Sequence, residues 1–112
     1  MIKSILIANR GEIACRIIKT SKKLGIKSSV IYSSEDENSL AVQMADHAFF
    51  LESKDVEKKE YLDTDQIISI ALKNKIEAIH PGYGFLSENA NFAKLVEDNG
   101  IKFIGPPYTA IK

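Results

Sequence analysis

The feature that most constrains the fold is a regular alternation of short apolar runs with amphipathic stretches. Strand-like runs recur along the 112-residue chain at 5–8, 28–32, 48–51, 77–79 and 101–104. The segments between them carry apolar residues at helical spacing. Strands that alternate with helices favour a parallel sheet, because each helix returns the chain to the same end of the sheet. We therefore expect an α/β fold, a doubly wound parallel sheet of about five strands with flanking helices, in one domain spanning 1–112.

Four stretches have the apolar spacing of amphipathic helices. Residues 12–24 give the most regular pattern, with Glu12 at the start and Gly25 as the expected stop. Further helices are expected after Ser39 and after Asp63, and before Gly100. The residues expected to face the core are Ile13, Ala14, Ile17, Ile18, Ser21 and Leu24; Leu40, Ala41 and Met44; Ile67, Ile68, Ala71 and Leu72; and Phe92, Ala93, Leu95 and Val96. The run 48–51 is continuously apolar, so we expect it to be covered on both faces.

Composition excludes several classes of partner. Lys+Arg and Asp+Glu both number 15, so a net charge of zero directs the chain neither to nucleic acid nor to an acidic membrane. Cys15 is the single cysteine, which rules out an internal disulfide and favours a reducing, cytoplasmic setting. No apolar run has the length that a bilayer requires, and the first run is too short for a signal peptide.

The stretch HPGYGFLSEN at 80–89 is the candidate site. Pro81 ends a strand, and Gly82 and Gly84 bracket Tyr83, so the backbone can turn sharply and let a ligand approach closely. Ser87 then serves as the expected N-cap of the next helix. A strand end, a glycine turn and a helix N-terminus place outward N–H groups where α/β sheets bind ligands.

The turn after the first strand has the position of a dinucleotide-binding loop without its chemistry. Residues 9–12, Asn-Arg-Gly-Glu, contain one glycine where that fingerprint needs three, and Glu12 would repel a pyrophosphate. The acids at 35–37 mimic a ribose-binding carboxylate, although a solvated loop is the better interpretation. Arg10 is expected to pair with a carboxylate of this domain or of a neighbouring one.

Three single residues are expected to be structural. His80 precedes a proline at a strand end, which favours a hydrogen-bonded structural imidazole over a catalytic base. His47 has no partner cluster for a metal ion. Cys15 lies beside the apolar face of the first helix, so we expect a packed thiol rather than a nucleophile.

The two motifs NRGEIACR at 9–16 and HPGYGFLSEN at 80–89 together resemble the N-terminal domain of biotin carboxylase, the ATP-dependent component of biotin-dependent carboxylases. The first motif is most similar to the α subunits of propionyl-CoA and methylcrotonyl-CoA carboxylases. Further similar pieces lie at 23–27, 44–46, 61–62 and 103–106, so the resemblance spans nearly the whole chain. Two places depart from it: a charged segment at 52–59 replaces a Gly-Pro-Ala-Pro-like loop, and Lys75 stands where glycine is usual.

The resemblance implies a Rossmann-like pre-ATP-grasp domain that packs against ATP-grasp and C-terminal domains absent from these residues. In such enzymes ATP and bicarbonate give carboxyphosphate, whose carbon dioxide passes to biotin on a carrier protein. Biotin, ATP and magnesium are the implied cofactors of the full enzyme, and none is expected to bind this domain alone. The magnesium ligands and nucleotide-binding lysines would lie in the other domains, so this domain has no metal site and is expected to be inactive alone.

The resemblance also implies roles for individual residues. Tyr83 would lie against the biotin ring, and Gly84 would offer close backbone approach within a cofactor-binding turn that includes Gly82. Glu88 would lie in the same pocket and is the one candidate for a catalytic role. The implied partners are the remaining domains of the subunit, a biotin carboxyl carrier domain and a carboxyltransferase subunit. The acyl-CoA or keto acid acceptor is chosen by a different component, so the resemblance implies no particular one.

Two other functions remain open on the residues. An independent nucleotide-binding module would show saturable NAD or ATP binding, against which the missing glycines argue. An assembly module is the other, since family members commonly dimerise and the basic face of the first helix, Arg16, Lys19 and Lys23, could meet a second copy. That face could equally be solvated, as charged stripes commonly are. A receiver-type domain is disfavoured, because Ala8-Asn9-Arg10 stands where it needs paired acids.

Overall fold

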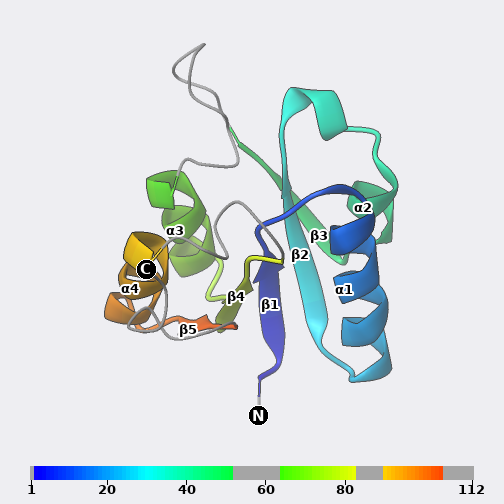
Figure 1. The fold of residues 1–112 in the computed structure, drawn as a ribbon. Coiled ribbons are helices and arrows are strands. Elements are labelled where there is room, and N and C mark those ends of the chain that lie inside the picture. Colours follow the sequence, from blue (N-terminus) through cyan, green and yellow to red (C-terminus); the bar gives the residue numbers. More distant parts are fainter. Residues whose placement is uncertain (1, 52–63, 83–89, 105–112) are drawn as a thin grey trace.

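The computed structural model describes residues 2–51, 64–82 and 90–104, and these form a single parallel sheet (Figure 1). The strands are β1 (Ser4–Ile7), β2 (Lys27–Tyr32), β3 (His47–Phe50), β4 (Ala78–His80) and β5 (Lys102–Phe103). Their order is β3-β2-β1-β4-β5, and every neighbouring pair is parallel. The expected doubly wound α/β architecture is confirmed.

The helices cover the two faces of this sheet in pairs. They are α1 (Gly11–Lys23), α2 (Leu40–Met44), α3 (Thr64–Lys73) and α4 (Ala90–Asp98), with a 3-10 turn, η1 (Ser34–Asp36), after β2. Figure 1 shows α1 and α2 on one side of the sheet and α3 and α4 on the other. The chain runs outward from β1 in one direction and from β4 in the other, so right-handed crossovers place the two pairs on opposite faces.

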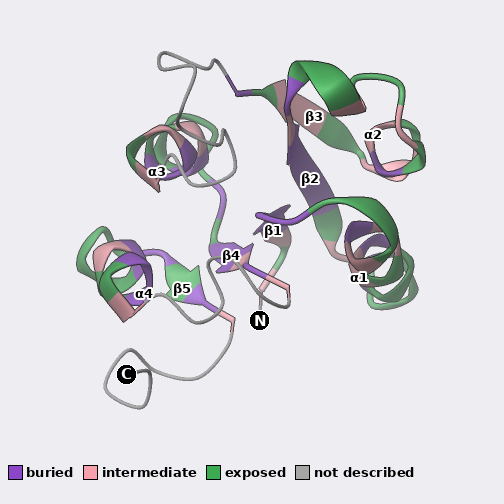
Figure 2. Cartoon of the chain, turned by 45° about the horizontal axis from the view of Figure 1, so that its top comes forward, coloured by how far each residue is buried: buried purple, intermediate pink, exposed green. Residues whose placement is uncertain are grey.

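Alternation along the strands divides the buried residues into two cores. Ile5 and Ile7 point to the α1 side and pack with Ile18, whereas Leu6 points to the α3 and α4 side and packs with Ile67. The strands in the middle of the sheet are accordingly the most buried of the elements that the structure describes (Figure 2). A sheet covered on both faces holds its strand ends in fixed positions, and the candidate site lies at the carboxyl ends of two of these strands.

Three helices end in the same way, with a residue in the left-handed region. These residues are Gly25 after α1, Lys75 after α3 and Gly100 after α4, with φ values of 73, 55 and 76°. In each case the next residue, an isoleucine, donates its N–H to the carbonyl five positions earlier, at 2.9, 2.9 and 3.1 Å. This is the Schellman arrangement, which favours glycine at the left-handed position. Gly25 and Gly100 are confirmed as helix stops.

Lys75 occupies that position with a side chain, so Lys75→Gly should stabilise the protein. A left-handed conformation costs a non-glycine residue about 1–2 kcal/mol, and the greater freedom of glycine in the unfolded chain offsets about 0.4–1 kcal/mol. We expect the free energy of unfolding in urea to rise by roughly 0.5–1 kcal/mol. The matched control is Lys22→Gly within α1, which should lower it by about 1 kcal/mol. Equal losses in both variants would contradict the explanation.

Three leucines expected in the core are instead exposed. Leu24, Leu40 and Leu72 are 60, 61 and 48% exposed. Leu24 is the residue that caps the end of α1, Leu40 is the first residue of α2, and Leu72 lies beside the buried stripe of α3 rather than within it. Periodicity identified the buried stripes but misassigned residues at their margins, since a helical face has no sharp edge in sequence.

The expectation that 48–51 is covered on both faces is wrong for the strand itself. β3 is at the edge of the sheet described here, and Phe50 is 46% exposed, with its ring 5.6 Å from that of Tyr32. Only Leu51, which follows the strand, is fully buried. An edge strand can be continuously apolar without being enclosed, so composition alone did not reveal its position. The charged segment 52–59, the Asp63 cap and the proline-rich end at 105–107 lie outside the described residues.

Candidate functional site

The candidate site lies where the sheet reverses its winding direction. β1 and β4 are neighbours, yet β1 leads on to β2 and β4 leads on to β5, on opposite sides. Their carboxyl ends are joined by the Ala8 N–H, which donates to the His80 carbonyl oxygen at 2.9 Å. In open α/β sheets this reversal point opens a crevice beyond the strand ends, and ligands bind there. The residues immediately after β1 and β4 therefore form the described part of the site.

Asn9 connects the two strand ends through its side chain. It is 3% exposed, and its Nδ2 donates to the Pro81 carbonyl oxygen at 2.8 Å. Its Oδ1 accepts the Arg10 N–H, also at 2.8 Å. Both ends of a buried amide thus have partners, as buried polar groups require.

Gly82 packs closely against the side-chain amide of Asn9. Its φ is +70°, a conformation that L-residues rarely adopt. A β carbon built at Gly82 would lie 2.5 Å from Asn9 Nδ2 and 2.9 Å from Ile13 Cγ2. The missing side chain is therefore explained by contacts within this domain, and the proposed role of Gly82 in cofactor binding stays a prediction.

His80 forms the structural hydrogen bond expected of it. Its Nδ1 accepts the Gly82 N–H at 3.0 Å, which fixes the neutral imidazole with its proton on Nε2. Partial burial lowers the pKa of His80 below the ordinary value of 6.5, because burial penalises the charged ring. Protonation of Nδ1 would also place two donors face to face.

This environment predicts that the protein loses stability in mild acid. The pKa of His80 is lowered in the folded state, so its contribution is fully present above 6.5 and declines as the pH falls from there to the folded-state value. The loss is at most about 1.4 kcal/mol for each pH unit of that window. Urea unfolding measured at several pH values should show this decline, and His80→Gln should flatten it. His47→Gln, at an exposed position, is the control; an unchanged slope in His80→Gln would contradict the assignment.

An ion pair extends the connection to a third strand end. Arg10 Nη2 lies 2.7 Å from Asp36 Oδ1, so the turn after β1 is bound to η1, which follows β2. The expectation that Arg10 pairs with a carboxylate of this domain is confirmed. Asp36 is one of the acids at 35–37 that mimic a ribose-binding carboxylate, and its engagement with Arg10 further weakens the dinucleotide-binding alternative.

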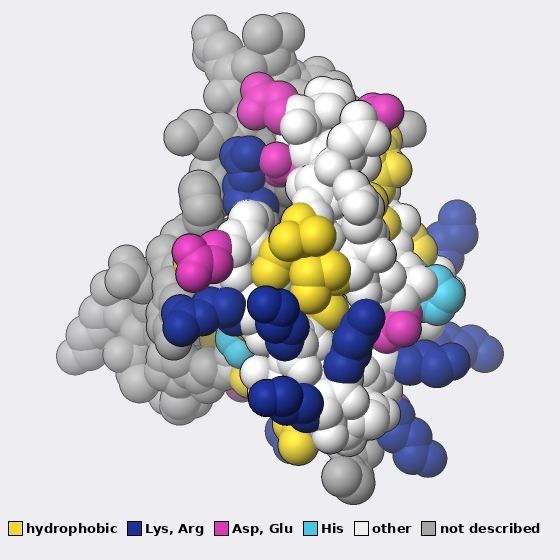
Figure 3. Space-filling model, turned by 90° about the vertical axis from the view of Figure 1, so that its right-hand side faces the viewer, with side chains coloured by type: hydrophobic (Ala, Val, Ile, Leu, Met, Phe, Trp, Pro, Cys, Tyr) yellow, Lys and Arg dark blue, Asp and Glu magenta, His cyan; other side chains and the backbone are white. Residues whose placement is uncertain are grey.

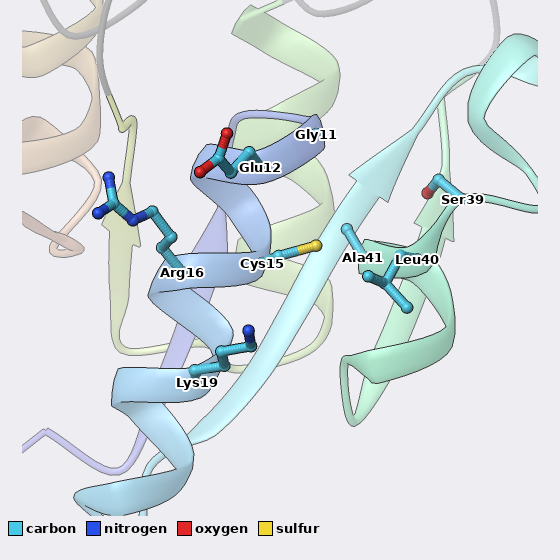
Figure 4. Close-up of a pocket in the computed structure, with 8 residues that line it drawn as sticks. All are labelled: Gly11, Glu12, Cys15, Arg16, Lys19, Ser39, Leu40 and Ala41. Carbon is cyan, nitrogen blue, oxygen red and sulfur yellow. The ribbon is translucent and has the colours of Figure 1, made fainter.

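A second surface feature is a shallow groove between α1 and α2. It is lined by Gly11, Glu12, Cys15, Arg16, Lys19, Ser39, Leu40 and Ala41. Figure 3 shows this side of the molecule, where apolar side chains are grouped beside several lysine and arginine side chains. In Figure 4 the Cys15 side chain points across the groove toward α2, whereas the Arg16 side chain points away from α2. Cys15 packs against the core of this face, as expected of a packed thiol.

Comparison with known protein families decides the assignment. The family model described as biotin carboxylase, N-terminal domain, matches residues 1–111. The chain belongs to this family. The similarity recognised in the motifs at 9–16 and 80–89 thus extends over the whole of this biotin carboxylase N-terminal domain.

Its relatives are much longer proteins. The chain is 51% identical to the mitochondrial methylcrotonoyl-CoA carboxylase subunit alpha of Mus musculus and to biotin carboxylase 1 of Bacillus subtilis, covering 99% of the chain but 15 and 24% of those proteins. The biotin carboxylase domain of 2-oxoglutarate carboxylase from Hydrogenobacter thermophilus, solved as a dimer with MgADP, ADP and bicarbonate, matches with a TM-score of 0.92 and 47% identity, over 99% of this chain and 24% of that one. The chain therefore spans about a quarter or less of these relatives.

Two observations on the described residues of this biotin carboxylase N-terminal domain bear on phosphate and metal binding. The N-terminus of α1 carries Glu12 in its first turn, which disfavours a phosphate there. Within 2–51, 64–82 and 90–104, no three His, Cys, Asp or Glu side chains are grouped so that they could hold a metal ion. Nor does any helix in those ranges have the length and apolarity to cross a bilayer.

The structure places only part of the site expected from sequence. Gly82 lies at the reversal point, and Arg16 and Lys19 line the α1–α2 groove, with Lys23 exposed in the last turn of α1. The three residues assigned to the biotin pocket, Tyr83, Gly84 and Glu88, lie outside the described residues, so their roles stay predictions. The described residues supply the hydrogen-bonded corner at Pro81 and Gly82 that leads into this stretch.

Asn9 had no place in the candidate site that the sequence predicted. It was treated as part of a turn, although an asparagine directly after a buried strand is a residue able to bond neighbouring backbone groups. The position of an asparagine after a strand shows that its side chain can form hydrogen bonds, but it does not show which backbone group is the partner. Pro81 is 72 positions away, and only the pairing of β1 with β4 brings the two together.

Proposed function

We propose that this chain is the N-terminal domain of a biotin-dependent carboxylase subunit, which uses ATP and bicarbonate to carboxylate biotin on a carrier protein. The observation that carries the proposal is the match of residues 1–111 to the biotin carboxylase N-terminal domain. The similarity to a biotin carboxylase domain solved with MgADP and bicarbonate supports the same activity for the whole subunit.

In this proposal the chain contributes one wall of the biotin pocket. The carboxyl end of β4 lies at the reversal point of the sheet, and the stretch that follows carries Tyr83, Gly84 and Glu88. Tyr83 would pack on the biotin ring, and Gly84 would let the backbone approach the ureido group. Glu88 would orient a catalytic group or balance a cation of the neighbouring domain.

The remaining functions would come from other polypeptide. Nucleotide and magnesium would be held by an ATP-grasp domain, as the membership of the biotin carboxylase family implies. The proposed partners are that domain, a C-terminal domain, a biotin carboxyl carrier domain and a carboxyltransferase subunit. A second copy of the chain would meet the basic face formed by Arg16, Lys19 and Lys23. The cytoplasm is the proposed compartment, because the one thiol, Cys15, has no second cysteine to pair with.

The test is reconstitution of activity. The purified 112-residue chain should neither hydrolyse ATP in the presence of bicarbonate nor carboxylate biotin. Supplying the ATP-grasp and C-terminal domains of such a subunit should restore both activities. Carboxylation by the chain alone would refute its inactivity, and reconstituted protein that never carboxylates biotin would refute the function.

A further inference from the structure

We propose that Asn9 is a positioning residue for the biotin-facing wall, because its amide fixes the peptide from which the chain leaves β4. The inference rests on the function proposed above and concerns a residue outside the HPGYGFLSEN stretch. Asn9 does not itself contact biotin in this proposal. It acts through the backbone at Gly82.

The peptide unit between Pro81 and Gly82 is held at both of its polar ends. Its carbonyl oxygen accepts a hydrogen bond from Asn9 Nδ2 at 2.8 Å, and its N–H donates to His80 Nδ1 at 3.0 Å. A peptide is a rigid plane, so two bonds on opposite edges fix its rotation about the chain axis. One comes from the β1 side of the site and the other from β4 itself.

The orientation of the Asn9 amide is fixed in turn. Its Oδ1 accepts the Arg10 N–H at 2.8 Å, so exchanging oxygen and nitrogen would oppose donor to donor at Arg10 and acceptor to acceptor at Pro81. Arg10 is itself bound to Asp36 at 2.7 Å. Three strand ends thereby support one side chain that is 3% exposed.

Such support is needed because the sequence at this corner permits alternatives. Proline followed by glycine fits turns in which the central peptide points either way, and glycine adopts both conformations easily. The close approach of Asn9 to Gly82 also restricts the orientation of this peptide, since a β carbon at Gly82 would lie 2.5 Å from Asn9 Nδ2. Asn9 therefore selects one of the orientations that Pro81-Gly82 allows.

The consequence reaches the proposed pocket through covalent geometry. The next α carbon lies about 3.8 Å from that of Gly82, so rotation of the preceding peptide redirects the chain that carries Tyr83 and Gly84. A displacement of about 1 Å in a substrate-positioning group can cost on the order of a hundred-fold in rate. Asn9 should accordingly affect the use of biotin more than the use of ATP.

The test is Asn9→Asp in the full carboxylase subunit, assayed with free biotin, ATP and bicarbonate. Aspartate keeps the shape and the acceptor for the Arg10 N–H, but it turns a carboxylate oxygen toward the Pro81 carbonyl. We expect kcat/KM for biotin to fall by about ten-fold to a hundred-fold, with KM for ATP unchanged within about two-fold. Asn9→Ser, which buries no charge, should give a smaller loss with the same selectivity and serves if the aspartate variant does not fold.

The matched control is Asn99→Asp. Asn99 Nδ2 also donates to a backbone carbonyl at 2.8 Å, that of Leu95, but it is exposed at the end of α4, before the amino end of β5. Its kinetic constants should equal those of the unsubstituted subunit. Parallel losses for ATP and biotin, or no loss for biotin, in both Asn9 variants would overturn the positioning role. An unsubstituted subunit that does not carboxylate biotin would instead overturn the proposed function.

Discussion

Gly82→Ala should destabilise the protein by about 3 kcal/mol. A left-handed conformation costs an alanine about 1–2 kcal/mol, and overpacking a fixed site adds about 1–3 kcal/mol. Here the new methyl group would meet Asn9 Nδ2 at 2.5 Å and Ile13 Cγ2 at 2.9 Å. Neither neighbour can move freely, because Asn9 is bonded to Pro81 and Ile13 belongs to α1. Urea unfolding would show the change as a lower midpoint.

Gly100→Ala separates the two causes. Gly100 has a φ of +76°, close to the +70° of Gly82, but a β carbon there would meet nothing within 4 Å. Gly100→Ala should therefore lower the free energy of unfolding only by the cost of the left-handed conformation, about 1 kcal/mol. If the two alanine variants were equally destabilised, the contact with Asn9 would not be the reason for glycine at position 82.

Phe92→Ala should produce a loss of about 3–5 kcal/mol, the largest expected here. Phe92 is 1% exposed in the core between α4 and the sheet, and its ring meets that of Phe103 edge-to-face at a centroid distance of 6.1 Å. Removing it leaves a cavity and forfeits the ring contact. A domain of this size is stable by roughly 5–15 kcal/mol, so the variant should unfold at a much lower urea concentration.

Phe50→Ala is the matched control for Phe92. Phe50 lies on the edge strand β3 and is 46% exposed, so the same truncation should cost about 1 kcal/mol or less. If Phe92→Ala does not fold, Phe92→Leu should still fold with a smaller loss. Similar losses for Phe92→Ala and Phe50→Ala would mean that the α4 core contributes less than its burial implies.

Much of this architecture was predictable because it is encoded locally. The apolar spacing of α1 and its Gly25 stop, and the Ser39 cap whose Oγ accepts the Val42 N–H at 3.3 Å, are properties of neighbouring residues. The motifs at 9–16 and 80–89 are likewise local, and they indicate the family that the match over residues 1–111 shows. Expectations were wrong at the margin of a buried helical face, as at Leu72, and where exposure depends on the position of a strand in the sheet, as at β3.

The sequence by itself determined the order of strands and helices, the family, and the glycine corner after Pro81. Only the tertiary structure decided that Asn9 and His80 hold the two polar ends of one peptide, and that the space beside Gly82 is filled by Asn9 and Ile13. The physical reason is that a side chain's capacity for a hydrogen bond is local, whereas its partner is set by which strands pair. The pairing of β1 with β4 made a turn residue part of the site.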